Sequence, residues 1–453
     1  MSRQLAQDAD IRAAYARDAS GLERIPESVA RPTELREVAE IIAEAASAGR
    51  PVTAAGGQTS TTGASITDVG TLLSLRGLDR IGPIDGDRGV VRAEAGVRLG
   101  ELKRTCAAAG WLLAPDPTSE DDCTIGGAIG CNASGARSLA YGAMRPHVAA
   151  LEVVMADGRQ ERYVRSRIEK NTAGYAAVQD PVDWFIGSEG TLGVIVEAEL
   201  SLLPLPERVT GIALPFARES DALAFVVQAR ESRVLTPRCI EFTDGQATAI
   251  VADATGDAAW RAAAALVYVE DAGSDDSPLD AWLALSEAHH VIEGAIRVYE
   301  GEAALRDARE WRHAVPAAMH ERAAAFRATG GRRISTDWAV PYRRLAAVLQ
   351  RARTLASDAG IAPAVTFGHA GNGHPHQNWV GESPHHVARV ERVVEETLKV
   401  VLAEGGTVAA EHGVGKLKAR WLSLQLGPRQ LGMLRAIKRE LDPLGILAPG
   451  NLQ

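Results

Sequence analysis

The stretch from Pro115 to Gly142 constrains the fold of this chain more than any other, because five of its residues are glycine. Backbone without Cβ atoms can approach a flat or phosphorylated ligand closely. A loop of this composition loses much conformational entropy when it is ordered, so we expect a bound ligand to compensate for that cost. The alternative is an ordinary turn-rich surface loop, in which small residues also gather. Hydroxyl and amide groups stand among the glycines: Thr118, Ser119, Thr124, Asn132 and Ser134.

The length and charge of the chain exclude several classes of protein. With 453 residues, the chain is long enough for two or more domains. Its hydrophobic fraction of 46% and charged fraction of 24% are typical of a globular protein. The net charge of -9 is spread along the chain without a basic stripe, which argues against nucleic acid as a partner.

The chain also lacks the sequence signs of export or membrane insertion. No apolar run approaches the ~20 residues that a membrane helix needs. The polar N-terminus has no apolar core typical of a secretory signal. The four cysteines form no CxxC pair, which argues against a structural zinc site. We therefore expect a cytoplasmic protein with reduced thiols and no transmembrane segment.

A second glycine-rich loop follows an amphipathic helix near the N-terminus. The helix is expected to start at Thr33, as its cap, and to end at Ala48, with a buried stripe that includes Val38 and Ile42. After a short strand, residues 56–63 read GGQTSTTG, in which consecutive backbone N–H groups could bind an anion. The loop matches neither GxGxxG nor GxxxxGKS/T, so it indicates neither a Rossmann nor a Walker site.

A third glycine-rich segment precedes a strand and a domain boundary. Residues 185–207 read FIGSEGTLGVIVEAELSLLPLPE. From Val194 the apolar and polar residues alternate, which predicts a half-buried strand. Pro204 and Pro206 end this strand and mark a boundary between domains.

These three segments, in this order and at this spacing, resemble the flavin-binding domain of the vanillyl-alcohol oxidase superfamily over residues 28–206. The resemblance implies FAD, and we expect it to be non-covalent because the loop at 51–66 contains no His or Cys. It places the FAD pyrophosphate on Gly56, Gly57, Gln58, Thr59 and Ser60. It implies further FAD contacts from Pro117, Thr118, Thr124, Gly127, Asn132, Ser134, Gly135, Tyr141, Gly142, Glu189, Gly190 and Ile195. The chain departs from the family at Ala55 and Gln58, where members often carry Arg and Gly.

Beyond Pro206 the pattern changes to alternating strand-like and helical segments, such as Thr210–Leu214 and Asp221–Arg230. A long charged helix is expected over Glu302–Arg327. This pattern predicts an α+β domain with an antiparallel sheet. We therefore expect an α+β protein with three parts: a two-part FAD-binding domain of the vanillyl-alcohol oxidase type at 1–206, an α+β substrate (cap) domain at 207–410, and a C-terminal segment at 411–453.

The last segment contains a helix and then DPLGILAPGNLQ. The closing segment of the family has the same PG-containing form, so the resemblance implies that residues 411–453 return to the flavin domain. It places Asn451 near the isoalloxazine, and a tail that is merely packed is the alternative.

Three histidines crowd one glycine-rich loop, FGHAGNGHPHQN, at residues 367–378. They are His369, His374 and His376, and an EHG triplet follows at 411–413. Imidazole is the commonest ligand for transition metals in proteins. Two imidazoles with one carboxylate suit Zn²⁺ or a similar divalent ion and leave a position open for a substrate. The alternative is a polar surface loop whose histidines bind nothing.

This loop and the later GTVAAEHGVGKLK resemble the C-terminal domain of the flavin-linked D-2-hydroxy-acid dehydrogenases, which include D-lactate dehydrogenase, D-2-hydroxyglutarate dehydrogenase and the catalytic subunit of glycolate oxidase. The resemblance implies a divalent metal, Zn or Mn, on His369, His376 and Glu411. It implies that His412 is the catalytic base, that Asn378 contacts the substrate, and that Arg312 pairs with the substrate carboxylate. The planar guanidinium suits that carboxylate, and an exposed helix Arg is the alternative. His374 departs from the usual wording of the loop, and we expect it to support the ligands.

The resemblance also bears on the substrate. Ser335 stands where the hydroxyglutarate enzymes carry Lys, which favours a lactate-like monocarboxylate. We therefore expect an FAD-dependent dehydrogenase that oxidises a D-2-hydroxy acid to the 2-oxo acid by metal-assisted proton abstraction and hydride transfer to flavin N5. The electron acceptor would be a quinone, a cytochrome or an electron-transfer flavoprotein, and a homodimer is compatible with the sequence. The alternatives are a metal-independent flavin alcohol oxidase, a non-catalytic flavoprotein subunit of an oxidase complex, and a metallohydrolase, which would leave the three glycine-rich loops without a purpose.

Overall fold

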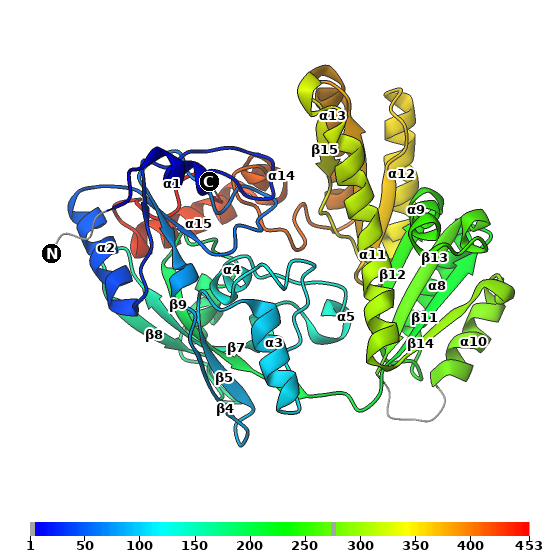
Figure 1. The fold of residues 1–453 in the computed structure, drawn as a ribbon, viewed down its shortest axis with the longest axis horizontal. Helices are drawn as coiled ribbons and strands as arrows, with labels where there is room; N and C mark the ends of the chain where they lie inside the picture. The colour runs from blue at the N-terminus through cyan, green and yellow to red at the C-terminus, as the bar shows by residue number, and fades with distance from the viewer. Residues whose placement is uncertain (1–4, 273–277, 453) are drawn as a thin grey trace. The chain divides into compact units, whose positions relative to one another are not determined.

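The computed structural model describes residues 5–272 and 278–452, which divide into two compact units (Figure 1). Unit 1 comprises Met1–Gly135, Gly142–Leu205 and Glu411–Gln453, and unit 2 comprises Ala136–Tyr141 and Pro206–Ala410. Both units combine helices with antiparallel sheet, so the prediction of an α+β protein is confirmed. Among the described residues, no helix is long and apolar enough to cross a membrane.

Unit 1 contains a small parallel sheet and a larger antiparallel one. The parallel sheet runs in the order β1 (Ser28–Ala30), β3 (Thr71–Ser74) and β2 (Val52–Ala55). The antiparallel sheet runs in the order β4 (Ile81–Asp85), β5 (Val90–Glu94), β9 (Val194–Ser201), β7 (Val148–Val154) and β8 (Gln160–Val164). A short pair is formed by β6 (Trp111–Leu112) and β10 (Leu203–Pro204). The alternating segment from Val194 is thus the central strand of the larger sheet.

The helices of unit 1 are α1 (Ala9–Ala14), α2 (Leu35–Ser47), α3 (Leu99–Ala108), α4 (Ile125–Gly130), α6 (Ala176–Gln179), α7 (Val182–Phe185), α14 (Leu422–Gln425) and α15 (Pro428–Leu441). Helices α2, α3, α4 and α7 bury apolar residues. The predicted stripe of α2 is buried, but the predicted cap is wrong. Glu34 is the N-cap residue, and the N–H of Thr33 instead donates to Oε2 of Glu37 at 2.8 Å, because that glutamate reaches back over the first turn.

The end of the chain packs into unit 1 beside its first strands. The N–H of Val52 donates to the carbonyl of Ile446, and the N–H of Ala448 donates to the carbonyl of Val52, each at 2.8 Å. Ile446 and Leu447 share an apolar core with α2 and β2. Figure 1 shows α2 in blue and α15 in red, at opposite ends of the sequence but in the same unit.

Unit 2 is built on one antiparallel sheet of seven strands. Their order is β14 (Arg297–Glu300), β11 (Thr210–Phe216), β13 (Ala265–Asp271), β12 (Pro237–Asp244), β16 (Val365–His369), β17 (His374–Gly381) and β15 (Arg332–Ser335). Its helices are α5 (Ser138–Tyr141), α8 (Glu219–Glu231), α9 (Gly245–Thr255), α10 (Pro278–Ala288), α11 (Gly301–Ala324), α12 (Leu345–Asp358) and α13 (Pro384–Ala403).

One face of this sheet carries most of its polar side chains. Residues that pair across neighbouring strands project to the same side of a sheet. The register pairs Cys239 with Glu270, His369 with His374, and Ser335 with Asn378. Every second residue along β12 and β17 projects to the same side, so all three pairs lie on one face of the sheet. The apolar parts of this face pack against α9 and α11 in a core that includes Val251 and Trp311. The polar face therefore lies under the long helix α11.

Candidate functional site

Unit 1 contains a cleft of about 910 Å³ whose walls are rich in glycine and hydroxyl-bearing residues. This volume falls in the range of roughly 300–1,000 Å³ that small-molecule sites occupy. The predicted FAD contacts that line the cleft are Gly56, Gly57, Gln58, Thr59, Ser60, Pro117, Thr118, Thr124, Gly127, Ser134, Glu189, Gly190 and Ile195. The three glycine-rich segments, far apart in the sequence, therefore meet at one cleft.

Two of these glycines are required by a close approach between loops. A Cβ atom on Gly56 would lie 2.1 Å from Oγ1 of Thr124, and one on Gly57 would lie 2.1 Å from the carbonyl oxygen of Asp122. Thr124 also caps α4, where its side chain accepts the N–H of Gly127 at 3.4 Å. The backbone of the 56–63 loop thus packs directly against the side chain of Thr124 and the backbone of Asp122. A side chain at either glycine would push the two loops apart.

Five predicted FAD contacts do not line the cleft: Asn132, Gly135, Tyr141, Gly142 and Asn451. Asn132 has a left-handed backbone with φ of 50°, and its side chain accepts the N–H of Arg145 at 3.0 Å. Asn451 is fully buried and donates to the carbonyls of Ala64 at 2.9 Å and Glu189 at 3.2 Å, both in residues that line the cleft. These two asparagines therefore hold the chain that forms the walls. Tyr141 belongs to unit 2.

The cleft is also lined by residues to which the sequence did not point, among them Arg76, Arg98 and Cys131. Arg76 holds the loop at residues 56–63 in place. Its Nε donates to the carbonyl of Gly56 at 2.8 Å, and its Nη2 donates to the carbonyl of Gly57 at 2.9 Å. Burial raises the pKa of Cys131 to about 12, so its thiol is neutral. Arg76 and Arg98 belong to no local motif, so no sequence signal identifies them as residues of the cleft.

Glu189 lines the cleft, but its carboxylate binds the backbone of the C-terminal segment. Oε1 accepts the N–H of Val414 at 2.6 Å, and the two oxygens accept the N–H of Gly415 at 3.0 and 2.8 Å. Burial raises the pKa of this carboxyl, while the backbone donors oppose that shift. The carboxylate thereby holds the start of the last segment, where Glu411 and His412 line the same cleft.

Glu411 and His412 are held by the first two glycine-rich loops. Oγ of Ser134 donates to Oε2 of Glu411 at 3.2 Å, and Oγ1 of Thr62 donates to the carbonyl of His412 at 3.4 Å. Nε2 of His412 lies 3.7 Å from Oε1 of Glu411, and the imidazole remains 29% exposed. The predicted catalytic base therefore stands in the wall of the cleft that the predicted FAD contacts form.

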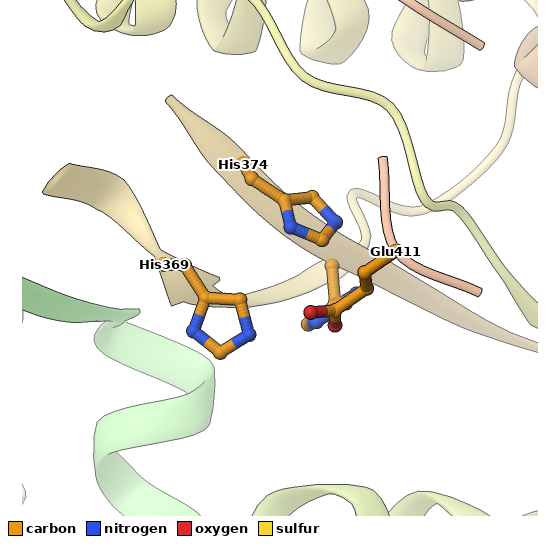
Figure 2. Close-up of side chains that lie close together, drawn as sticks. His369, His374 and Glu411 are labelled. Carbon is orange, nitrogen blue, oxygen red and sulfur yellow. The ribbon is translucent and has the colours of Figure 1, made fainter. Parts of the chain in front are cut away.

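The three predicted histidines of unit 2 lie together on one tight hairpin. His369 ends β16 and pairs in register with His374 at the start of β17, while His376 follows on the same face. The turn between them needs Gly373, which has φ of 66° and whose Cβ would lie 1.9 Å from the carbonyl oxygen of Val340. Figure 2 shows His369 and His374 close together. One ring nitrogen from each of the three histidines lies within 4.8 Å of the others.

Each of these imidazoles also has an outer partner in unit 2. Nδ1 of His369 lies 2.8 Å from Oε1 of Glu241, and Nε2 of His374 lies 3.1 Å from Oδ1 of Asp337. Nδ1 of His376 lies 3.4 Å from the carbonyl oxygen of Thr336. An outer acceptor on one ring nitrogen fixes the tautomer and leaves the other nitrogen as a metal ligand. This donor set therefore suits a divalent transition metal, with Nε2 of His369 and of His376 as its natural ligands.

Arg312 projects from α11 onto the same sheet face. Its guanidinium lies 5.0 Å from the centre of the Tyr268 ring, and its Nη1 lies 3.8 Å from Sγ of Cys239. Its Nε is buried and has no hydrogen-bond partner among the described residues. The alternative of an exposed helix arginine is thus wrong, because α11 packs this residue against the sheet.

A buried carboxylate beside Arg312 is neutralised by another arginine. Glu270 accepts from Arg137 at 2.9 and 3.3 Å, and Arg238 lies 3.9 Å away. Burial alone would raise the pKa of Glu270, but Arg137, Arg312 and Arg238 lower it to about 2. Three cations surround this one carboxylate, so the area keeps an excess of positive charge that suits an acidic ligand.

Asn378 lies one alternation beyond His376 on β17 and is 1% exposed. Its Oδ1 accepts from Nη1 of Arg333 at 3.1 Å, and its Nδ2 has no hydrogen-bond partner among the described residues. The sequence did not point to Arg333, nor to Glu241 and Asp337 behind the histidines. Arg333 lies on β15 and Glu241 on β12, and the sheet brings these strands, which are distant in sequence, to the histidine loop. Asp337 follows just after the end of β15.

Comparison with known families finds two models that match this chain. Residues 205–452 match FAD linked oxidases, C-terminal domain, and residues 26–163 match FAD binding domain.

Curated relatives cover nearly the whole chain. A D-lactate dehydrogenase of Archaeoglobus fulgidus is 31% identical over 94% of this chain and 90% of its own length. The glycolate oxidase subunit GlcD of Bacillus subtilis is 29% identical over 97% of this chain and 92% of its own length. A D-2-hydroxyglutarate dehydrogenase of Xanthomonas citri pv. viticola is 29% identical over 94% of this chain and 89% of its own length.

Among solved structures, an alkyldihydroxyacetonephosphate synthase superposes with a TM-score of 0.73 over 99% of this chain and 82% of that one. The two chains are only 18% identical, so the likeness concerns the fold alone.

Proposed function

Because this chain belongs to the family of FAD-linked oxidases, we propose that it is a dehydrogenase that oxidises a D-2-hydroxy acid to the corresponding 2-oxo acid. The observation that carries this proposal is the polar sheet face of unit 2. Three imidazoles share that face with Nδ2 of Asn378, which has no hydrogen-bond partner among the described residues. The partly buried cation of Arg312 projects onto the face from α11. A hydroxy acid offers a hydroxyl and a carboxylate, which are the groups that such a set binds.

We assign FAD binding to unit 1 and binding of the acid to unit 2. The fit of FAD is supported by the cleft itself, whose glycine and hydroxyl walls leave room for a flat ligand with an anionic centre. Arg98 adds a cation to that wall. When bound, FAD supplies an acceptor for the hydride that leaves the α-carbon, and an electron acceptor must then reoxidise it. FAD is proposed to be non-covalent, so denatured protein should lose its yellow colour on a desalting column.

We assign a divalent metal, Zn or Mn, to His369 and His376, with the outer acceptors Glu241 and Thr336 supporting this assignment. Glu411 is proposed as the carboxylate ligand on the resemblance. Its neighbour in sequence, Ala410, is bound through its N–H to the carbonyl of Asp337 at 2.8 Å. A bound cation would make the substrate hydroxyl more acidic. We keep His374 in a supporting role, since its Nε2 lies against Asp337.

The remaining steps use side chains of the protein. His412 is proposed to take the proton of the substrate hydroxyl, for which an imidazole has a suitable pKa. Arg312 binds the carboxylate, where a guanidinium can offer two parallel hydrogen bonds. Asn378 donates from Nδ2 to a substrate oxygen. Holding the acid in one pose contributes to catalysis by limiting its motion before the reaction.

The proposal is tested by adding D- and L-2-hydroxy acids to the purified protein under anaerobic conditions and recording flavin absorbance. We expect bleaching by D-acids, loss of that bleaching with a chelator, and recovery with Zn²⁺ or Mn²⁺. Bleaching that survives complete metal removal would favour a metal-independent flavin alcohol oxidase. Yellow protein that no hydroxy acid bleaches would favour a non-catalytic flavoprotein subunit.

A further inference from the structure

Arg333 lies on the polar sheet face, at the edge strand β15, and has no acidic partner among the described residues. Nη1 of its guanidinium donates a hydrogen bond to Oδ1 of Asn378 at 3.1 Å. Burial lowers the pKa of its guanidinium, and no carboxylate of the described part of the chain offsets that shift. The preceding residue, Arg332, projects to the opposite face and forms an ion pair with Glu391 at 2.5 Å. The two adjacent arginines therefore differ. Arg332 is paired with Glu391, whereas the half-buried guanidinium of Arg333 has N–H donors that no described residue accepts.

The side chain of Arg333 leans along the strand toward the histidines. In the register, Arg333 stands opposite Val380, and Ser335 stands opposite Asn378. The guanidinium nevertheless reaches Asn378, one alternation nearer to His376 on the same face. Ser335 is small, so it leaves the space above Asn378 open to this cation. A longer side chain at position 335 would compete for that space.

The hydrogen bond to Arg333 also fixes how Asn378 presents its amide. A guanidinium only donates hydrogen bonds, so the oxygen of the amide must face Arg333. The Nδ2 group must then point away from Arg333, and it is buried without a partner among the described residues. A buried donor left unpaired is costly, which indicates that a ligand completes it.

Arg312 and Arg333, which form no ion pair with the described residues, lie on opposite sides of the histidines. Arg312 contacts Tyr268 on β13 and Cys239 on β12, whereas Arg333 belongs to β15 at the sheet edge. Strands β16 and β17, which carry the histidines, lie between them in the sheet. One cation therefore stands on either side of the metal-binding donor set.

We propose that Arg333 and Nδ2 of Asn378 bind a second acidic group of the substrate, so that the preferred substrate is a short D-2-hydroxy dicarboxylate. This inference rests on the proposed function. It replaces the expectation of a lactate-like monocarboxylate, which was based only on Ser335 standing where the hydroxyglutarate enzymes carry Lys. Arg333 supplies a cation from two residues earlier on the same strand face. It is a specificity-determining residue, because it binds the end of the acid that does not react.

The test compares two acids of equal chain length, D-2-hydroxyglutarate and D-2-hydroxypentanoate, which differ in the distal carboxylate. The holoenzyme should show a higher kcat/KM for the dicarboxylate. The ratio of the two kcat/KM values should fall about 10- to 100-fold in Arg333→Gln, the range expected for a lost hydrogen bond to a charged group. Arg333→Lys should restore part of the ratio. Arg332→Gln, which removes the neighbouring cation on the other face, should leave the ratio unchanged.

Binding of the 2-oxo acids, measured by calorimetry, separates this inference from the proposed oxidation. We expect 2-oxoglutarate to bind more tightly than 2-oxopentanoate, and Arg333→Gln to remove that difference. If no hydroxy acid bleaches the flavin while this difference still depends on Arg333, then the oxidation is refuted and the acid-binding site stands. Equal binding of the two oxo acids to the wild type, or a difference that Arg333→Gln leaves intact, would overturn the inference.

Discussion

Replacing Glu241 by Gln should weaken metal binding without removing a metal ligand. Oε1 of Glu241 lies 2.8 Å from Nδ1 of His369, and both side chains are nearly buried, at 13% and 12% exposure. The carboxylate holds the proton on Nδ1 and makes Nε2 a better donor to a cation. Gln keeps an oxygen at the same place but lacks the charge, so the tautomer persists while the basicity of the imidazole falls.

The expected size of this effect follows from the outer position of Glu241. Loss of such a partner typically lowers metal affinity about 10- to 100-fold, which corresponds to roughly 1.4–2.8 kcal/mol. Removal of the ligand itself, in His369→Ala, should cost more. The metal is first stripped with a chelator, and Zn²⁺ or Mn²⁺ is then titrated against a fluorescent competitor to obtain the Kd of each variant.

Glu321→Gln is the matched control, because this exposed glutamate on α11 belongs to the same unit and should leave the Kd unchanged. Thermal unfolding of the metal-free proteins shows whether Glu241→Gln alters the fold itself. An unchanged Kd in Glu241→Gln, with a normal melting temperature, would refute the reasoning that this carboxylate supports a metal ligand.

Three further predictions concern other parts of the molecule. His412→Ala should lower turnover ~10²–10⁴-fold while the protein stays yellow, and near-normal turnover would remove His412 from the role of base. The pKa of Glu270 in the fold, about 2, is below its ordinary value of 4.5, so its stabilising contribution is present above that value and is lost as the pH falls toward 2. Urea unfolding at pH 7 and pH 3 should therefore show a smaller pH effect in Glu270→Gln, and an equal effect would contradict this pairing. Gly57→Ala should lower the flavin content, because the added Cβ meets a carbonyl at 2.1 Å, whereas Gly432→Ala on α15 has open space and should keep it.

The sequence was informative wherever function depends on local composition. Glycine and hydroxyl residues crowd three separate segments, and the structure brings all three to one cleft. Likewise, the three histidines lie within eight residues of one another, so their meeting needs only a tight hairpin. The local pattern therefore predicts that the three histidines lie together, because their placement depends on few residues outside the hairpin.

The sequence did not reveal partners that are distant along the chain. Glu189 was predicted only as an FAD contact, yet its carboxylate binds Val414 and Gly415, more than 200 residues later. The glycines at 56 and 57 were interpreted as space for a ligand, and the structure adds that they also let two loops touch. No local signal distinguishes these roles, because each one depends on which segments become neighbours in the fold.

Arg333 shows the same limit in the proposed substrate site. Position 335 was the one compared with the family, and a serine there indicated a missing cation. The period of two along a strand puts residue 333 on the same face, and its long side chain leans back to Asn378. Arg333 can thus supply a cation near position 335 from two residues earlier on β15. Comparing only the residue at position 335 with the family does not reveal this.

We propose that this protein takes a hydride from the α-carbon of a D-2-hydroxy acid onto FAD. This proposal is tested most directly by anaerobic stopped-flow mixing of the metal-loaded holoenzyme with D-2-hydroxyglutarate, D-lactate and their L-enantiomers, with and without deuterium at C2. We expect a D-acid to bleach the flavin within one turnover, deuterium at C2 to slow this step, and the L-acids not to react. Bleaching by L-acids alone, or no bleaching by any of them, would contradict the proposal.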